Sequence, residues 1–213
     1  AIAGRLSLRH PQRRSLEILD RITNIAPPGK DADIAAVLET IRSEFSSVTD
    51  FEREFPSLCF ALATGVGKTR LMGAFIAYLH LEHGINNFFV LAPNLTIYNK
   101  LIADFRNRNH PKYVFTGIAE FAIDAPSIIT GDDYERDPLS GSLFGGVRIN
   151  IFNISKINSE VRGGKSPRIK RLSEYIGQSY FDYLAGLPDL VMLMDESHRY
   201  RASAGIRAIN ELK

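Results

Sequence analysis

The feature that most constrains the fold is a glycine-rich stretch, Leu62-Ala63-Thr64-Gly65-Val66-Gly67-Lys68-Thr69. An apolar run, residues 58–63, leads into it, and a run with apolar residues at helical spacing, 71–81, follows it. Glycines between a buried strand and a helix start let backbone N–H groups converge on an anion, and the lysine adds a positive charge. The stretch therefore predicts a phosphate-binding loop in which Thr69 offers its hydroxyl to Mg²⁺. One position departs from the P-loop pattern G-x-x-x-x-G-K-S/T, because Leu62 stands where the pattern has glycine.

A second motif, Asp195-Glu196-Ser197-His198, follows the apolar run 190–194. A phosphate loop needs a carboxylate on a neighbouring strand to hold Mg²⁺, and Asp195 has that placement. Glu196 is then positioned to orient or deprotonate an attacking water, and His198 would face the same cleft. An isolated Asp-Glu pair at a strand end is more often a solvated charge pair. The phosphate loop upstream is what favours a catalytic role here.

Strand and helix patterns alternate along the chain. We expect strands at 58–63, 88–91, 147–152 and 190–194, with shorter candidates at 112–115 and 127–129. We expect helices at 11–25, 32–45, 68–83, 95–105, 169–176 and 180–185, and one that begins near residue 203. This alternation predicts an α/β fold, with a mostly parallel central sheet, helices on both faces and ligands beyond the carboxyl ends of the strands.

Composition limits the partners and the compartment. The net charge is only +2, from 26 basic and 24 acidic residues, so nucleic-acid binding has to depend on local clusters. A single cysteine, Cys59, excludes an intrachain disulfide and a multi-cysteine zinc site, and we expect it to be a small apolar strand residue. No apolar run is long enough to cross a bilayer. These features favour a cytoplasmic protein with no membrane association.

Several motifs together resemble those of superfamily 2 helicases and translocases of the DEAD/DEAH type. They are A-T-G-V-G-K-T, D-E-S-H, the upstream L-R-H-P-Q and the strand-ending L-A-P-N-L. More narrowly, M-D-E-S-H-R-Y-R and I-N-I-F-N-I-S-K-I-N resemble the restriction (Res) subunit of type III restriction-modification enzymes. The resemblance implies a RecA-like P-loop domain that uses ATP and Mg²⁺ and moves along or unwinds DNA.

The resemblance also implies roles for individual residues. Gln12 matches the glutamine that reads adenine, and Arg9 either assists at the base or phosphates or belongs to a solvated basic face with Arg13 and Arg14. Thr69 and Asp195 would bind the metal, Lys68, Asp195 and Glu196 would be catalytic, and His198 would couple the site to movement. The residues implied to contact nucleotide in the loop are Thr64, Gly65, Val66, Gly67, Lys68, Thr69 and Arg70.

Two segments match motifs that grip the nucleic-acid backbone. One supplies Pro93, Asn94 and Thr96, and the other supplies Asn153 and Ser155. A helix N-terminus has N–H groups for phosphate, although the same residues also suit an ordinary strand-to-helix turn with Asn94 as its cap. Lys100 stands where many members of the superfamily have glutamine, so its contact is left open.

The expected organisation is an N-terminal helical segment with the adenine-binding glutamine, 1–56, followed by the first RecA-like motor domain, 57–213. The resemblance implies a second RecA-like domain with catalytic arginines and a nuclease in a longer parent chain, so we expect this chain alone to bind nucleotide but hydrolyse it weakly. Implied partners are double-stranded DNA and a modification (methyltransferase) subunit. Two alternatives stay open: a P-loop phosphotransferase with the basic stretch 162–171 as its lid, and a nucleotide-binding module without catalysis.

Overall fold

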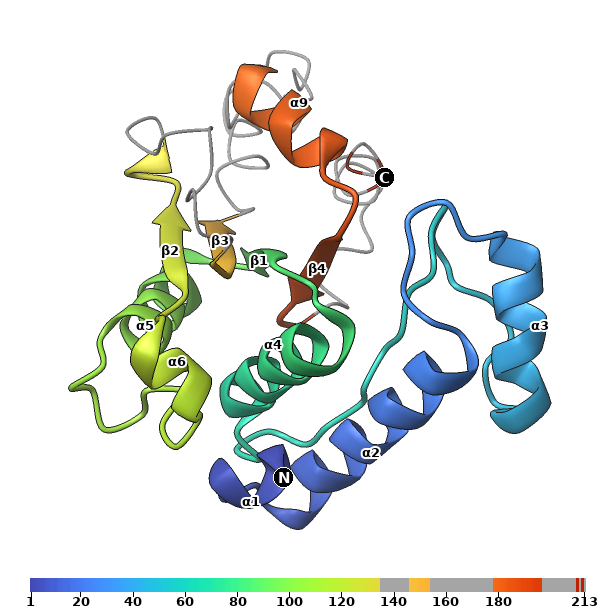
Figure 1. Ribbon diagram of the computed structural model, residues 1–213, viewed down its shortest axis with the longest axis horizontal. Helices are drawn as coiled ribbons and strands as arrows, with labels where there is room; N and C mark the ends of the chain where they lie inside the picture. The colour runs from blue at the N-terminus through green and yellow to red at the C-terminus, as the bar shows by residue number, and fades with distance from the viewer. Residues whose placement is uncertain (135–145, 154–177, 197–209, 211, 213) are drawn as a thin grey trace, which may run out of the picture.

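The computed structural model describes residues 1–134, 146–153, 178–196, 210 and 212 (Figure 1). The predicted helix 169–176, the basic stretch 162–171 and, apart from residues 210 and 212, the helix predicted from 203 onward lie outside these residues. The elements, in chain order, are α1 (Ile2–Arg5), α2 (His10–Ile25), α3 (Ile34–Glu44), α4 (Lys68–His83), β1 (Asn87–Ala92), α5 (Leu95–Arg106), α6 (Ala119–Ile123), β2 (Ser127–Thr130), β3 (Arg148–Asn153), α9 (Gln178–Gly186) and β4 (Leu190–Met194).

The four described strands form one parallel sheet in the order β2-β3-β1-β4. In the central strand β1, Phe88 lies opposite Ile149 on β3 and Val191 on β4. The prediction of a parallel sheet from continuous apolar runs is confirmed for these four strands. A strand buried on both faces has no polar side to alternate with its apolar side, and β1 is such a strand.

Helices cover both faces of this sheet (Figure 1). Phe88 and Val90 of β1 face a core shared with α1, α2, α4, α5 and α6. Phe89 and Leu91, which point the other way, pack against Tyr180 and Leu184 of α9. The alternation along one strand therefore divides the interior into two cores, and the predicted α/β architecture is confirmed.

The N-terminal helix α2 packs against α4. Leu16 and Leu19 of α2 belong to the same core as the apolar side chains of α4. A polar network joins the two helices as well, because the Tyr78 hydroxyl lies 2.9 Å from Thr23 Oγ1 and donates to Asp20 Oδ1 at 2.8 Å. Burial raises the pKa of Tyr78 to about 12, so its phenol stays protonated and can donate at neutral pH. These polar contacts hold the second half of α2 against the second half of α4.

The predicted strand 58–63 is wrong, since the structure has no strand there. Leu58, Phe60 and Leu62 are half-buried against the main core, whereas Cys59 is exposed and is not the strand residue we expected. The alternation of apolar side chains accounts for packing on one face, but a strand also needs backbone hydrogen bonds to a neighbour. A cavity of about 1230 Å³ lies between this segment and β4.

A second strand prediction, 112–115, is also wrong. Tyr113, Val114 and Phe115 form turns and are buried in the core, with Phe115 packed edge-on against Phe105 and Phe121. Phe121 belongs to the short helix α6, which the sequence pattern did not reveal. Consecutive apolar residues that pack in a turn look like a short strand in the sequence, because both conformations bury them.

The contact between α4 and this turn provides a stability test. A Cβ added to Gly73 would lie 2.7 Å from Val114 Cβ and 3.3 Å from its carbonyl oxygen. Because neither backbone can yield easily, we expect Gly73→Ala to lower the free energy of unfolding by about 1–3 kcal/mol in chemical denaturation. Gly4→Ala is the matched control, since nothing lies within 4 Å of its added Cβ. Equal stabilities for the two variants would contradict this view of the packing.

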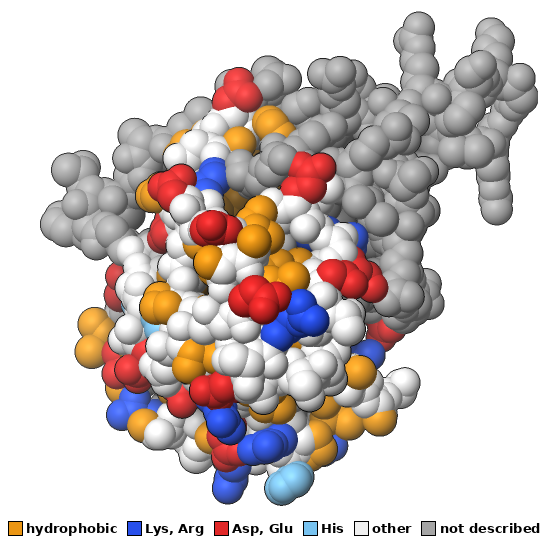
Figure 2. Space-filling model, turned by 90° about the vertical axis from the view of Figure 1, so that its right-hand side faces the viewer, with side chains coloured by type: hydrophobic (Ala, Val, Ile, Leu, Met, Phe, Trp, Pro, Cys, Tyr) orange, Lys and Arg blue, Asp and Glu red, His pale blue; other side chains and the backbone are white. Residues whose placement is uncertain are grey.

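The described surface carries charges of both signs. On the side that bears α3, acidic and basic side chains are interspersed with apolar ones (Figure 2). This mixture agrees with the net charge of +2 for the chain. Within the described residues, no helix combines the length and apolar character needed to cross a membrane.

Candidate functional site

The glycine-rich loop leads directly into α4. Gly65 and Gly67 have φ angles of 81° and 92°, a left-handed backbone that costs other residues roughly 1–2 kcal/mol. Gly67 is the residue before the helix and has no side chain that could cap it, and α4 begins at Lys68. The first N–H groups of a helix have no partner within the helix, so an anion at this position would be stabilised. The left-handed glycines and the helix start are compatible with phosphate binding, which stays a prediction.

Gln12 and Arg9 hold this loop from α2. The Gln12 side chain is only 2% exposed, its Nε2 donates to the Gly67 carbonyl at 2.8 Å, and its Oε1 accepts from Arg9 N at 2.8 Å. The Arg9 guanidinium donates to the Gly65 carbonyl at 3.3 Å. Both polar ends of the Gln12 amide are therefore engaged with backbone in this structure. Its contact with adenine stays a prediction, and holding the loop is a role that the sequence did not indicate.

The acidic motif lies at the carboxyl end of β4, beside β1. Asp195 N donates to the Leu91 carbonyl at 3.4 Å, which continues the pairing of the two strands. Lys68 Nζ donates to Glu196 Oε1 at 2.8 Å, and each of these side chains is 29% exposed. The structure thus brings together a lysine and a glutamate that are 128 positions apart in the chain. Pairing with β1 places Glu196 at the carboxyl edge of the sheet, and α4, which leads back to the start of β1, begins at that edge with Lys68.

The surroundings of the Asp195 carboxyl group oppose its ionisation. Burial raises the pKa of its carboxyl group, and the neighbouring Glu196 raises it further, while Lys68 and Lys100 act in the opposite direction. The pKa remains above its usual value on balance, so the two ammonium groups do not fully compensate the carboxylate. Additional positive charge at this position would stabilise the ionised form.

Lys100, whose contact was left open by the sequence, lies at the candidate site. It lies on α5, and its Nζ donates to Thr69 Oγ1 at 2.8 Å and is 3.4 Å from Asp104 Oδ2. Thr69 is buried and is the hydroxyl expected to bind Mg²⁺. The spacing of Lys100 and Asp104, four residues apart in a helix, is common on helix surfaces and did not predict the contact with Thr69. The contact with Thr69 depends on how α5 packs beside α4.

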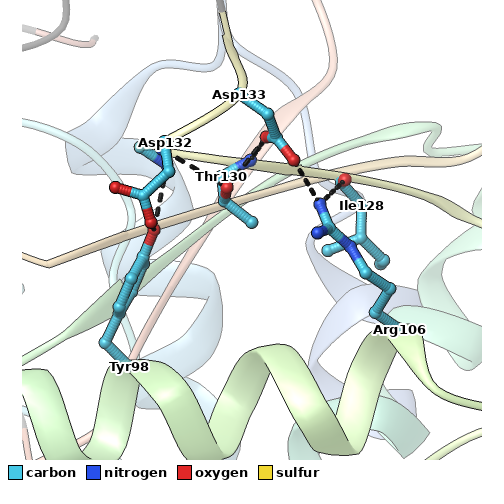
Figure 3. Close-up of polar contacts among 7 residues, drawn as sticks. Tyr98, Arg106, Ile128, Thr130, Asp132 and Asp133 are labelled. Carbon is cyan, nitrogen blue, oxygen red and sulfur yellow. Dashed lines mark hydrogen bonds and ion pairs between the residues drawn. The ribbon is translucent and has the colours of Figure 1, made fainter.

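Polar contacts hold α5 in its first turn, through Tyr98, and at its last residue, Arg106 (Figure 3). The Tyr98 hydroxyl donates to Asp132 Oδ2 at 3.1 Å. Arg106 donates to Asp133 Oδ2 at 2.6 Å and to the Ile128 carbonyl at 2.8 Å. Although burial opposes ionisation of Asp133, hydrogen bonds from Thr130 and the Arg106 guanidinium hold the pKa of that carboxyl below its usual value. The helix that carries Lys100 is therefore anchored to the end of β2.

The remaining predicted residues differ in how far the structure describes them. Asn94 Oδ1 accepts from Ile97 N at 2.9 Å, so Asn94 is the cap of α5, as the alternative interpretation held. Arg70 donates to the Leu6 carbonyl at 3.1 Å and thereby joins α4 to α1. Asn153 is buried at the end of β3, opposite Ala92, which places it at the same edge of the sheet as Asp195. Ser155 and His198 lie outside the described residues.

Thr69 and Asp195 are suitable ligands for Mg²⁺. Hydroxyl and carboxylate oxygens are hard donors, and Mg²⁺ commonly takes one or two protein ligands with phosphate oxygens and water completing its shell. Among the described residues no three His, Cys, Asp or Glu side chains gather into a metal site. The Thr69 hydroxyl already accepts a hydrogen bond from an ammonium group, so a positive charge is accommodated beside it.

The parallel sheet covered by helices on both faces, with a glycine-rich loop before α4 and an acidic pair after β4, defines an α/β domain of the RecA-like type. Residues 6–213 match the family described as type III restriction enzyme, Res subunit, and the chain belongs to that family. The family resemblance stated from the motifs is thereby confirmed.

A relative in Haemophilus influenzae is described as the probable type III restriction-modification enzyme HindVIP Res subunit. It is 28% identical over 171 residues, which cover 80% of this chain and 30% of the relative. The chain therefore spans about a third of the length of this curated relative. No solved structure matches the chain.

Proposed function

We propose that this chain is the ATP-binding first motor domain of an ATP-dependent DNA translocase or helicase, within a type III-like restriction endonuclease subunit. Family membership supports a helicase-like motor in general terms. The observation that supports ATP binding is the 2.8 Å contact between Lys68 and Glu196 beside a loop with left-handed glycines. Such a contact joins a phosphate-binding lysine to a potential general base.

The residues of the site would act together on ATP. Lys68 would exchange Glu196 for the β- and γ-phosphates, where the N–H groups at the start of α4 also point. Glu196, released from the ammonium, would accept a proton from the attacking water. Thr69 and Asp195 would hold Mg²⁺, which when bound neutralises charge on the phosphates. Gln12 would keep the loop in place through the Gly67 carbonyl, in addition to its expected contact with adenine.

The remaining roles concern the track and the partners. Pro93, Asn94, Thr96, Asn153 and Ser155 would contact the DNA backbone at the carboxyl edge of the sheet. Backbone contacts carry little sequence information and weaken with salt, so specificity would come from a modification subunit. A second RecA-like domain would supply the arginines that stabilise transferring phosphate, and His198 would couple hydrolysis to movement.

Two measurements test this function. Isothermal titration of this chain with ADP and Mg²⁺ is expected to show one binding site per chain. The ATPase of a longer protein with both motor domains is expected to rise when double-stranded DNA is added. Turnover that ignores DNA would reject the motor, transfer of phosphate to an acceptor other than water would favour the phosphotransferase, and binding without turnover would favour the non-catalytic module.

A further inference from the structure

Lys100 occupies a position that the proposed function does not explain. Its ammonium donates to Thr69 Oγ1 at 2.8 Å and lies 3.4 Å from Asp104 Oδ2. Thr69 is the residue proposed to bind Mg²⁺, and Asp104 is a buried carboxylate on the same helix as Lys100. One ammonium group thus contacts both the proposed metal ligand and a buried carboxylate.

The backbone of α5 is fixed, whereas the Lys100 side chain has room to move. Asn94 caps the helix, and Tyr98 and Arg106 anchor it to the loop after β2 (Figure 3). The Lys100 side chain is 52% exposed, and its four-carbon stem rotates easily. Its ammonium can therefore change partners without any movement of the helix.

We propose that the Lys100 ammonium takes the place of the metal charge beside Thr69 when no metal is bound. In the nucleotide-free chain it donates a hydrogen bond to the Thr69 hydroxyl. When Mg²⁺ binds that hydroxyl, the ammonium leaves Thr69 and stays paired with Asp104. This inference rests on the proposed ATP site. Lys100 is then a positioning residue: it orients the Thr69 hydroxyl before the metal binds. It also supplies positive charge near the phosphates when no metal is bound.

Electrostatics explains why the exchange has this direction. A monovalent and a divalent cation repel each other strongly at contact distance, so they cannot both occupy one hydroxyl oxygen. Asp104 gives the displaced ammonium a place to remain, because a buried carboxylate is costly to leave without its cation. Its other oxygen, Oδ1, lies 3.2 Å from His110 Nδ1 and has no hydrogen bond from the described residues. Lys100 Nζ, 3.4 Å from Oδ2, is already close enough to stay paired with Asp104 after it leaves Thr69.

The test compares ADP affinity with EDTA and with Mg²⁺, because the inference predicts different effects in the two conditions. For Lys100→Met, which keeps the apolar stem, metal-free ADP should bind about tenfold more weakly, about 1.4 kcal/mol. ADP with Mg²⁺ should bind equally or more tightly. The ratio of the dissociation constant with EDTA to that with Mg²⁺ should therefore rise at least about tenfold. Lys100→Arg, which retains the charge, should keep metal-free binding.

Two further variants make the result specific. Lys112→Met is the matched control, since Lys112 is exposed and lies in a turn, and its ratio should equal that of the unaltered chain. Asp104→Asn should lower the ratio. Without the Asp104 carboxylate, Lys100 loses its second partner and competes more strongly with Mg²⁺ for the Thr69 hydroxyl. This variant still decides the question if Lys100→Met fails to fold.

Each outcome has a clear meaning. A ratio unchanged within about twofold in Lys100→Met, or equal weakening with and without Mg²⁺, would overturn the inference, as would a rise in the ratio for Asp104→Asn. Absence of ADP binding by the unaltered chain in both conditions would instead overturn the proposed function, and this inference with it. The unaltered chain thus separates the two failures.

Discussion

Replacing Lys68 by alanine is expected to lower the affinity of this chain for ADP with Mg²⁺ by about 10- to 100-fold, because a hydrogen bond to a charged group contributes roughly 1.5–3 kcal/mol. The lysine begins α4 directly after the left-handed Gly67, where the phosphates are proposed to bind. Isothermal titration calorimetry measures the change.

The control for Lys68→Ala is Lys112→Ala, which removes the same charge from an exposed turn. Its affinity should equal that of the unaltered chain. Circular dichroism should show both variants folded, since the Lys68–Glu196 pair is partly exposed and such pairs contribute little to stability. Equal nucleotide affinities for the unaltered chain and Lys68→Ala would defeat the assignment of the loop.

The largest effect on activity is expected for Glu196→Gln. A general base contributes roughly 10²–10⁴-fold to a rate, so ATP hydrolysis should fall by about this factor in a protein with both motor domains. Glutamine keeps the size of the side chain and an oxygen that can accept from Lys68, but it cannot take a proton from water. Nucleotide affinity should therefore change by no more than a few fold.

Single-turnover hydrolysis separates chemistry from binding for this variant. Glu17→Gln is the matched control, because Glu17 is an exposed glutamate on α2 whose nearest charged contact is Arg14 at 3.6 Å. It should leave both turnover and affinity unchanged. If Glu196→Gln hydrolysed ATP at the normal rate, or lost affinity as much as rate, Glu196 would be a structural or binding residue rather than a base.

Local signals predicted most elements correctly. The helix expected at 68–83 is observed as α4 (Lys68–His83), and Gly84 ends it in the left-handed conformation with N–H bonds to the carbonyls of His80 and Leu79. The run 190–194 is observed as β4 (Leu190–Met194), and Asp195 and Glu196 follow it as expected. Helix caps depend on residues close in the chain, and a continuous apolar run is visible in the sequence whichever strand it pairs with, which is why the sequence reveals these elements.

Elements that depend on a distant partner were predicted less well. The segment 58–63 has a strand pattern but no strand, because a ladder needs a neighbour at the right register. The turn at Tyr113 to Phe115 is apolar because it packs in the core, and its conformation follows from α5 and α6 around it. The boundary at residue 56 stays a prediction, although α1 and α2 share a core with α4.

The sequence by itself determined the kind of site: a loop with two glycines, a lysine and a threonine, and an acidic pair after a buried strand. Residue type and local spacing carry that information, since they decide backbone freedom and charge. Only the tertiary structure decided which groups meet. Gln12 reaches Gly67 across 55 positions, Lys100 reaches Thr69 across 31, and Lys68 reaches Glu196 across 128. Such contacts arise from helix and strand packing, which no spacing within the chain encodes.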